Sequence, residues 1–226
     1  MGNSIHLVVS FNPGVLRDSF FFFVIGGYMW FWTGIGSRDI SIEEEDIIFD
    51  LAYHLAAMDG VLRTGCASGS DERFEDGYAE AYSDGLTFRS PELYIPWNNF
   101  MPNIQRPWKR NRAHPGLLGD AWNDAMQLVA EIHPAHNRLS QGAYKLHARN
   151  MFQPLGYFLD KPSKFLLACS DSDKYGDPKG GTRTAWMLAK RYDIPCFNIR
   201  GRDMDEALDF IESVVFNNRD YMPRLW

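Results

Sequence analysis

Three glycine-bearing segments, each placed after an apolar run and before a helical pattern, constrain the fold of this chain most. They are residues 33–38 (TGIGSR), 63–71 (RTGCASGSD) and 179–184 (KGGTRT). A strand that ends in a glycine turn and leads into a helix leaves backbone N–H groups free at the positive end of the helix dipole, where a phosphate can bind. Three such turns predict a pocket for a phosphorylated ligand at the carboxyl edge of a parallel sheet.

Apolar runs and helical patterns alternate along the chain. Apolar runs predict five strands, at residues 29–32, 61–64, 93–95, 165–169 and 196–199. Helical spacing predicts six helices, at residues 41–60, 71–83, 120–133, 140–158, 182–192 and 203–216. Ser41 and Glu44 form a capping-box pattern, Asp120 and Ser140 are candidate caps, and Pro154 kinks or shortens its helix. This alternation predicts an α/β protein with a parallel sheet of about five strands and helices on both faces.

Composition limits the classes of protein to consider. A chain of 226 residues that is 45% hydrophobic forms most simply one domain, which we place at residues 29–226. The net charge of −6 argues against indiscriminate coating of nucleic acid. Cys66, Cys169 and Cys196 lack metal-ligand spacing, and we expect free thiols in a reducing cytoplasm. We therefore expect a cytoplasmic protein with no metal and no cofactor.

Residues 1–28 differ from the rest of the chain. We place them outside the domain, as an N-terminal extension of uncertain origin. The apolar run at residues 20–32 is interrupted by glycines and is shorter than the roughly 20 residues that span a membrane. No positive cluster precedes it and no small-residue cleavage site follows. We expect no membrane association. Two explanations stay open: Met29 is the natural start and residues 1–28 are an artefact or a loose extension, or the extension supplies a core element such as an added edge strand.

The glycine segments and their flanks resemble the SLOG superfamily of Rossmann-like domains. This superfamily includes DNA-processing protein A, the Lonely Guy phosphoribohydrolases and small phage and bacterial proteins of the YspA type. The resemblance covers about residues 29–199 and includes TGIGSR, RTGCASGSDERFEDG and GGTRTAWMLAKRYDIPCFNI. It implies a Rossmann-like fold, a nucleotide ligand and a homodimer, and we expect a phage or bacterial YspA-like member.

Two motifs carry the resemblance to named members. The DNA-processing protein A pattern is matched by Thr64, Gly65, Ala67, Gly69 and Asp71. The stretch KLHARN at residues 145–150 is similar to the methionine-histidine-x-arginine-lysine stretch of the phosphoribohydrolases. The second match implies that Arg149 lies near the position of their active-site arginine.

One departure from the family bears on activity. The phosphoribohydrolases carry PGGxGTxxE, and here Arg183 replaces the second-loop glycine while Met187 occupies the glutamate position. A methionine cannot act as a general acid or base. The resemblance therefore does not extend to that mechanism, although Asp71 or Glu75 could supply a displaced carboxylate. Asp71, Glu75 and Arg149 are the candidates for catalysis, and whether the chain is an enzyme stays open.

The predicted ligand-binding residues lie in or beside the glycine segments, apart from Arg149. They are Gly34, Gly36, Ser37, Arg38, Thr64, Gly65, Ala67, Ser68, Gly69, Asp71, Arg149, Gly180, Gly181, Thr182 and Thr184. The alternative is that the glycines only form tight turns. Asp71 either complements a helix dipole or holds a ribose hydroxyl. Gln141, Lys145 and Arg149 form a polar stripe for which a solvated face is the alternative.

A basic and aromatic segment offers a different ligand class. It contains Arg106, Lys109, Arg110 and Arg112 near Trp97, Phe100 and Trp108. Such a mixture suits single-stranded nucleic acid, and a solvated lid loop is the alternative. His133, His136 and His147 do not have the spacing of a known zinc helix.

Three hypotheses for function follow. The first is a sensor or binding module for a nucleotide or nucleotide-derived ligand, without turnover. The second is a nucleoside-phosphate N-glycosidase that uses a displaced carboxylate. The third is a protein that binds single-stranded DNA in the manner of DNA-processing protein A.

Overall fold

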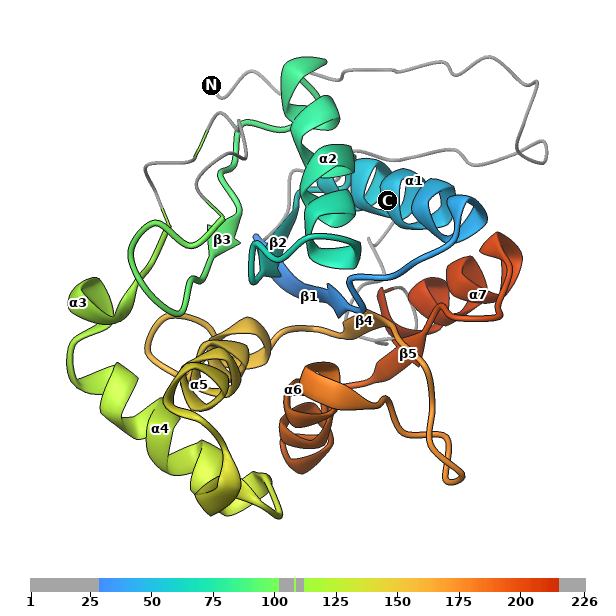
Figure 1. The fold of residues 1–226 in the computed structure, drawn as a ribbon. Helices are drawn as coiled ribbons and strands as arrows, with labels where there is room; N and C mark the ends of the chain where they lie inside the picture. Colours follow the sequence, from blue (N-terminus) through green and yellow to red (C-terminus); the bar gives the residue numbers. More distant parts are fainter. Residues whose placement is uncertain (1–28, 102–107, 109–111, 216–226) are drawn as a thin grey trace, which may run out of the picture.

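A parallel sheet of five strands forms the centre of the computed structural model, which describes residues 29–101, 108 and 112–215. The strands are β1 (Trp30–Gly36), β2 (Gly60–Thr64), β3 (Glu92–Leu93), β4 (Leu166–Cys169) and β5 (Cys196–Asn198). Their order is β3-β2-β1-β4-β5, and every pairing is parallel. Helices cover both faces (Figure 1). The predicted Rossmann-like α/β fold is confirmed.

The first strand is longer than predicted. It continues through Gly34 to Gly36, where the sequence had suggested a turn. A Cβ at Gly34 would lie 2.7 Å from the Phe74 ring, so this glycine lets a helix approach the sheet closely. Its role is therefore in packing. The third strand is shorter than predicted, and the chain continues through an isolated parallel bridge between Tyr94 and Ala113.

One face of the sheet packs against α1 (Ile42–Ala57), α2 (Ser70–Ser83) and α7 (Met204–Val215). The core between them includes the fully buried rings of Trp32, Phe74 and Phe165. The helix α1 begins with the expected capping box: the Glu44 N–H donates to the Ser41 hydroxyl, and the Ser41 N–H donates to the Glu44 carboxylate. This reciprocal pair fixes the direction in which α1 leaves β1.

The other face packs against α5 (Gln141–Leu155) and α6 (Gly180–Arg191). The helix α4 (Asp120–Ile132) lies outside α5 (Figure 1), and the short elements α3 (Pro115–Leu118) and η2 (His136–Arg138) flank it. Asp120 is the first residue of α4 and not its cap, because Gly119 precedes the helix with φ 54°. Pro154 lies inside the last turn of α5, which ends three residues before Phe158.

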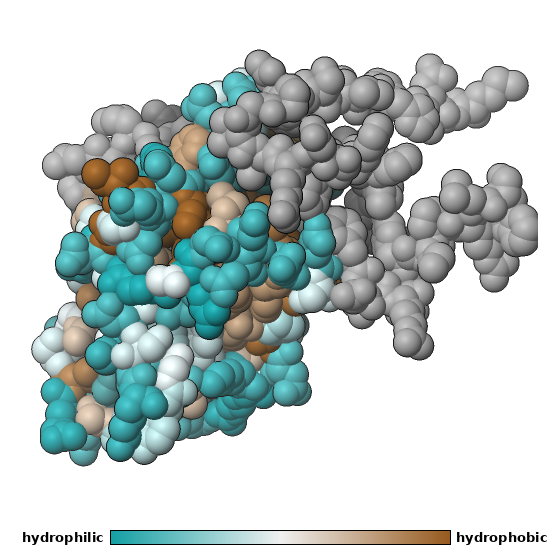
Figure 2. Space-filling model, turned by 90° about the vertical axis from the view of Figure 1, so that its right-hand side faces the viewer, coloured by the Kyte–Doolittle hydropathy of each residue, from teal (hydrophilic) through white to brown (hydrophobic). Residues whose placement is uncertain are grey.

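The surface view shows a mostly hydrophilic face with apolar residues in small separate areas (Figure 2). Within the described residues, no helix is both long enough and apolar enough to cross a membrane. The extension expected at residues 1–28 lies outside the described residues.

Candidate functional site

A cavity of about 430 Å³ lies at the carboxyl ends of β1, β2 and β4. Parts of all three glycine segments line it: Gly36, Ser37, Arg38, Ala67, Asp71, Lys179, Gly180, Gly181 and Thr182. The helix α5 adds Ala143, Leu146, His147, Arg149 and Asn150, and the residues after β4 add Ser170 and Asp171. Because the carboxyl ends of parallel strands meet at one edge, segments far apart in the sequence converge on this cavity.

Beside the start of α2, the protein's own carboxylate engages the backbone of the first two glycine segments. Asp71 is 2% exposed and accepts hydrogen bonds from the N–H groups of Gly36 at 3.2 Å and Ala67 at 3.4 Å. The Ser70 N–H donates to the Ser37 carbonyl at 3.0 Å. The N–H groups of Gly36, Ala67 and Ser70 therefore have internal acceptors, and a phosphate on the first two would have to displace Asp71.

Arg149 pairs with this buried carboxylate. Its guanidinium is 3.3 Å from Asp71 Oδ2 and donates to the Gly65 carbonyl. A Cβ at Gly65 would overlap the guanidinium, so only glycine fits there. Burial lowers the pKa of Arg149, and the Asp71 charge opposes that shift. Burial likewise raises the pKa of Asp71, against the effect of Arg149. The two groups form a buried ion pair in the cavity wall.

The N-terminus of α6 is open. Lys179 is its N-cap and makes no side-chain capping bond, and the first turn holds no acidic residue. The N–H groups of Gly180, Gly181 and Thr182 donate to no described residue. Gly180 has φ 63°, a conformation that glycine adopts without strain. Three unpaired donors and the positive end of a helix dipole therefore face the cavity.

Two buried polar atoms beside this helix start also lack partners within the described part of the chain. They are the Oδ1 atom of Asn150, a residue 4% exposed, and the Nε atom of Arg149, a residue 5% exposed. The Nδ2 atom of Asn150 donates to the Gly181 carbonyl at 2.9 Å, which joins α5 to the first turn of α6. Buried polar atoms without partners are uncommon in proteins, and a ligand that reached this wall could supply the missing partners.

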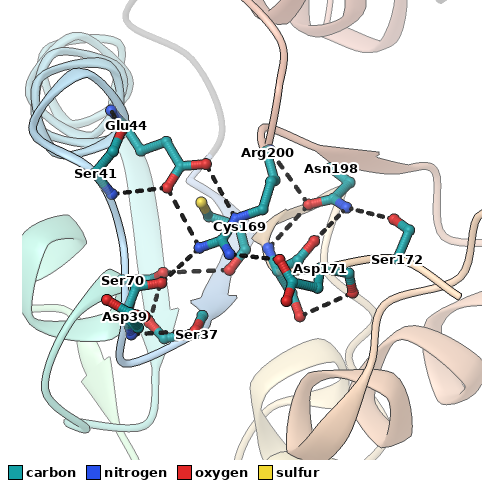
Figure 3. Close-up of polar contacts among 11 residues, drawn as sticks. Ser37, Asp39, Ser41, Glu44, Ser70, Cys169, Asp171, Ser172, Asn198 and Arg200 are labelled. Atoms are coloured by element: carbon teal, nitrogen blue, oxygen red, sulfur yellow. Dashed lines mark hydrogen bonds and ion pairs between the residues drawn. The ribbon is translucent and has the colours of Figure 1, made fainter.

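The opposite wall is held by two side chains, Asn198 at the end of β5 and Arg200 just after it. Arg200 bonds to Glu44 at 3.0 Å, to Asp171 at 2.6 Å and to the Asp39 carbonyl at 2.5 Å (Figure 3). Asn198 pairs with the backbone of Ser170 at 3.1 and 2.8 Å. Sequence reasoning missed Arg200 and Asn198, although Gly201 lies in the turn between β5 and α7 with φ 73° and was a signal of the same kind as the other glycine segments. Arg200 neutralises the Asp171 carboxylate at the cavity wall.

Several predicted site residues lie outside the cavity lining: Gly34, Thr64, Gly65, Ser68, Gly69, Glu75 and Thr184. Gly65 accommodates Arg149, as described above, and Gly69 has φ 79° ahead of α2. Glu75 is fully buried near Cys66, where burial and then the Glu75 charge raise the pKa of that thiol. Gln141 and Lys145 also lie outside the lining, so of this stripe only Arg149 faces the cavity.

The basic and aromatic segment is mostly buried where it is described, and Trp97 is its exposed ring, at 38%. Phe100 and Trp108 are buried in the core, and Arg112 is buried with its guanidinium donating to the carbonyls of Phe100 and Met101. Arg106, Lys109 and Arg110 lie outside the described residues. His133 and His147 are adjacent, yet within the described chain no three His, Cys, Asp or Glu side chains gather as a metal site would require.

Comparison with known proteins gives one weak similarity. No protein-family model matches the chain, and no curated protein matches it. A solved structure of DNA processing protein A from Helicobacter pylori, described for its single-stranded DNA binding mode, is similar at a TM-score of 0.42 and 15% identity. The similarity covers 84% of this chain and 76% of that one. The function proposed below rests on the geometry of this chain's own site.

Proposed function

We propose that the chain binds a nucleotide or nucleotide-derived ligand, with a phosphate at the N-terminus of α6. The observation that carries this proposal is the set of unpaired N–H groups of Gly180, Gly181 and Thr182 beside the unpaired polar atoms of Arg149 and Asn150. A phosphate oxygen can accept from several donors at once, and the helix dipole adds about 0.3–1 kcal/mol for an anion.

The charges around the cavity favour an anion. Arg38 and Lys179 line it and form no ion pair with another described residue. The two carboxylates of the lining are already paired, Asp71 with Arg149 and Asp171 with Arg200. A bound phosphate would therefore meet two unpaired cations and no unpaired carboxylate. The volume exceeds that of a lone phosphate and lies within the ~300–1,000 Å³ range of small-molecule sites.

The site favours binding without turnover. A general acid or base must reach the reacting bond with a free proton or lone pair. Asp71 is engaged by two N–H groups and Arg149, and Glu75 lies outside the lining. Met187 has no ionisable group. We therefore expect no release of free base from adenosine monophosphate, in a chromatographic assay of the parent protein and of Asp71→Asn.

Calorimetric titration of two matched variants tests the binding proposal. Gly181→Asp places a carboxylate among the free N–H groups, and a Cβ there has room, 3.6 Å from Asn150. Gly142→Asp places the same charge at the second residue of α5, outside the lining. We expect Gly181→Asp to weaken adenosine monophosphate binding by roughly tenfold or more, about 1.4 kcal/mol, and Gly142→Asp to change it little. Equal affinity in the parent and Gly181→Asp would contradict the proposal.

Single-stranded DNA is the competing ligand, since its backbone phosphate could use the same donors. Titration with a short deoxythymidine oligonucleotide distinguishes single-stranded DNA from a mononucleotide as the ligand. Binding of the oligonucleotide with a steep loss of affinity in salt, and no binding of the mononucleotide, would favour DNA. The mononucleotide is the expected ligand, because Phe100 and Trp108 of the basic segment are buried and only Trp97 among its described rings is exposed, which leaves one ring for stacking on bases.

A further inference from the structure

A second cavity, of about 320 Å³, adjoins the first across the start of α6. The two cavities share three lining residues, Gly180, Gly181 and His147. The second is formed between the end of α4 and the outer side of α6. One ligand that places a phosphate on the α6 N-terminus can therefore extend its remaining part into this second cavity.

The wall of the second cavity is mainly apolar. Ile132 at the end of α4, Pro134 just after it and Met187 of α6 line it together with the imidazole of His133. Thr184 and Arg183 complete the lining on α6, and Arg183 is paired with Asp173 and Asp177. The rings of His133 and His147 pack with their centroids 4.7 Å apart. Apolar side chains, a polarisable thioether and an imidazole are the surroundings that a flat heterocyclic ring prefers.

His147 contributes one directed polar group to this wall. Its Nδ1 atom is 2.7 Å from the Thr184 hydroxyl, so Nε2 is the ring nitrogen left for a ligand. Burial lowers the pKa of His147 to about 4, with further contributions from His133 and Arg149. The ring is therefore neutral at pH 7. A neutral ring nitrogen can hydrogen-bond to the edge of a heterocycle without attracting a second anion.

We propose that the second cavity is the nucleobase compartment of the ligand site, with the base held between Met187 and the imidazole of His133 and its edge on His147. This inference rests on the proposed function, because the phosphate on α6 fixes where the base begins. It assigns a ligand-specific role to Met187, and it places the determinant of ligand choice on α4 and α6, away from the glycine segments of β1 and β2.

Titration with two ligands separates this inference from the phosphate proposal. Ribose 5-phosphate carries the phosphate and sugar alone, and adenosine monophosphate adds the base. The variant Met187→Ala removes one wall of the compartment. Met126→Ala is the matched control, since Met126 is also half-buried against the same core but lines neither cavity. A third variant, Met187→Trp, fills the compartment.

We expect the parent to bind adenosine monophosphate at least tenfold more tightly than ribose 5-phosphate. Met187→Ala should weaken adenosine monophosphate binding by about three- to tenfold, and Met187→Trp should weaken it further, with ribose 5-phosphate unchanged in both and Met126→Ala like the parent. Equal affinity of the parent for the two ligands would overturn the compartment while leaving the phosphate site intact. Equal losses for both ligands in the Met187 variants would overturn it as well. No binding of either ligand by the parent would overturn both proposals.

Discussion

The helices α2 and α6 both begin at a glycine segment on the carboxyl edge of the sheet. They differ in whether an acidic side chain engages the backbone N–H groups beside the helix start. At α2 the Asp71 carboxylate accepts from Gly36 and Ala67 and pairs with Arg149. At α6 no acidic residue is present in the first turn, and three N–H groups have no described acceptor. Both starts have the backbone geometry that suits an anion, but a carboxylate engages the neighbouring Gly36 and Ala67 donors at α2, and no acidic side chain lies in the first turn of α6.

A glycine turn before a helix is therefore not by itself a ligand site. An acidic side chain in the first turn can occupy the donors and become part of the framework. The α2 start therefore supports the cavity wall, while the α6 start is available to a ligand. The comparison predicts that changes at α2 alter stability and changes at α6 alter binding.

The largest effect on the free energy of unfolding is expected from replacing Asp71 at the start of α2. Asp71→Ala removes the partner of a buried guanidinium and the acceptor of two N–H groups. Breaking a buried ion pair by removing one partner typically costs about 3–5 kcal/mol, and we expect a loss of that size in the free energy of unfolding from urea titration. Asp71→Asn, which keeps an acceptor oxygen, should lose less. A loss of less than about 1 kcal/mol in the free energy of unfolding of Asp71→Ala would contradict the structural role of Asp71.

A smaller effect is expected from His147, which lines both cavities beside the open start. Its pKa is about 4 in the folded protein and near 6.5 when exposed, so between these values the unfolded chain binds a proton that the folded chain does not. Stability therefore falls as the pH falls from 7 to 5, by about 2 kcal/mol from this group. His147→Gln should remove that part of the pH dependence in parallel urea titrations. An identical pH dependence in the parent and the variant would contradict the neutral, buried ring.

The smallest effect is expected from adding a charge to the open start. Gly181→Asp supplies the missing acidic residue in the first turn of α6, so the unliganded protein should gain about 0.3–1 kcal/mol of stability from the helix dipole. Gly181→Asn has a similar shape without the charge and isolates the electrostatic part. Thermal unfolding at low ionic strength is the measurement. A destabilised Gly181→Asp would show that the start of α6 is already occupied.

The order of strands and helices could be predicted from the sequence because it depends on local patterns. Apolar runs and the Ser41–Glu44 capping box are visible within a few residues, and the helix α1 follows from them. The extent of β1 could not be predicted, since Gly34 looks like a turn residue until the Phe74 ring is placed against it. Local conformational preference gives way there to a contact between α2 and the sheet.

The candidate site was less predictable than the fold. The sequence placed Asp71, Arg149 and Gly181 near one edge, but it could not show that Asp71 folds back onto the Gly36 N–H group, 35 residues earlier. Arg200 was passed over although Gly201 follows it in a turn, and His147 was considered only as a metal ligand. Each of these roles depends on partners from distant segments, which one-dimensional patterns do not encode.

The Arg200 contacts have a consequence for how the protein is made. Arg200 bonds to Glu44 across a sequence separation of 156 residues, and Asn198 beside it fixes the backbone of Ser170. During synthesis, the wall of the cavity at Asp171 cannot form until the ribosome has released a chain that includes β5. Closing so long a loop is entropically costly and slow. A nascent chain thus completes this wall only after β5 has emerged, when most of the described residues are already outside the ribosome.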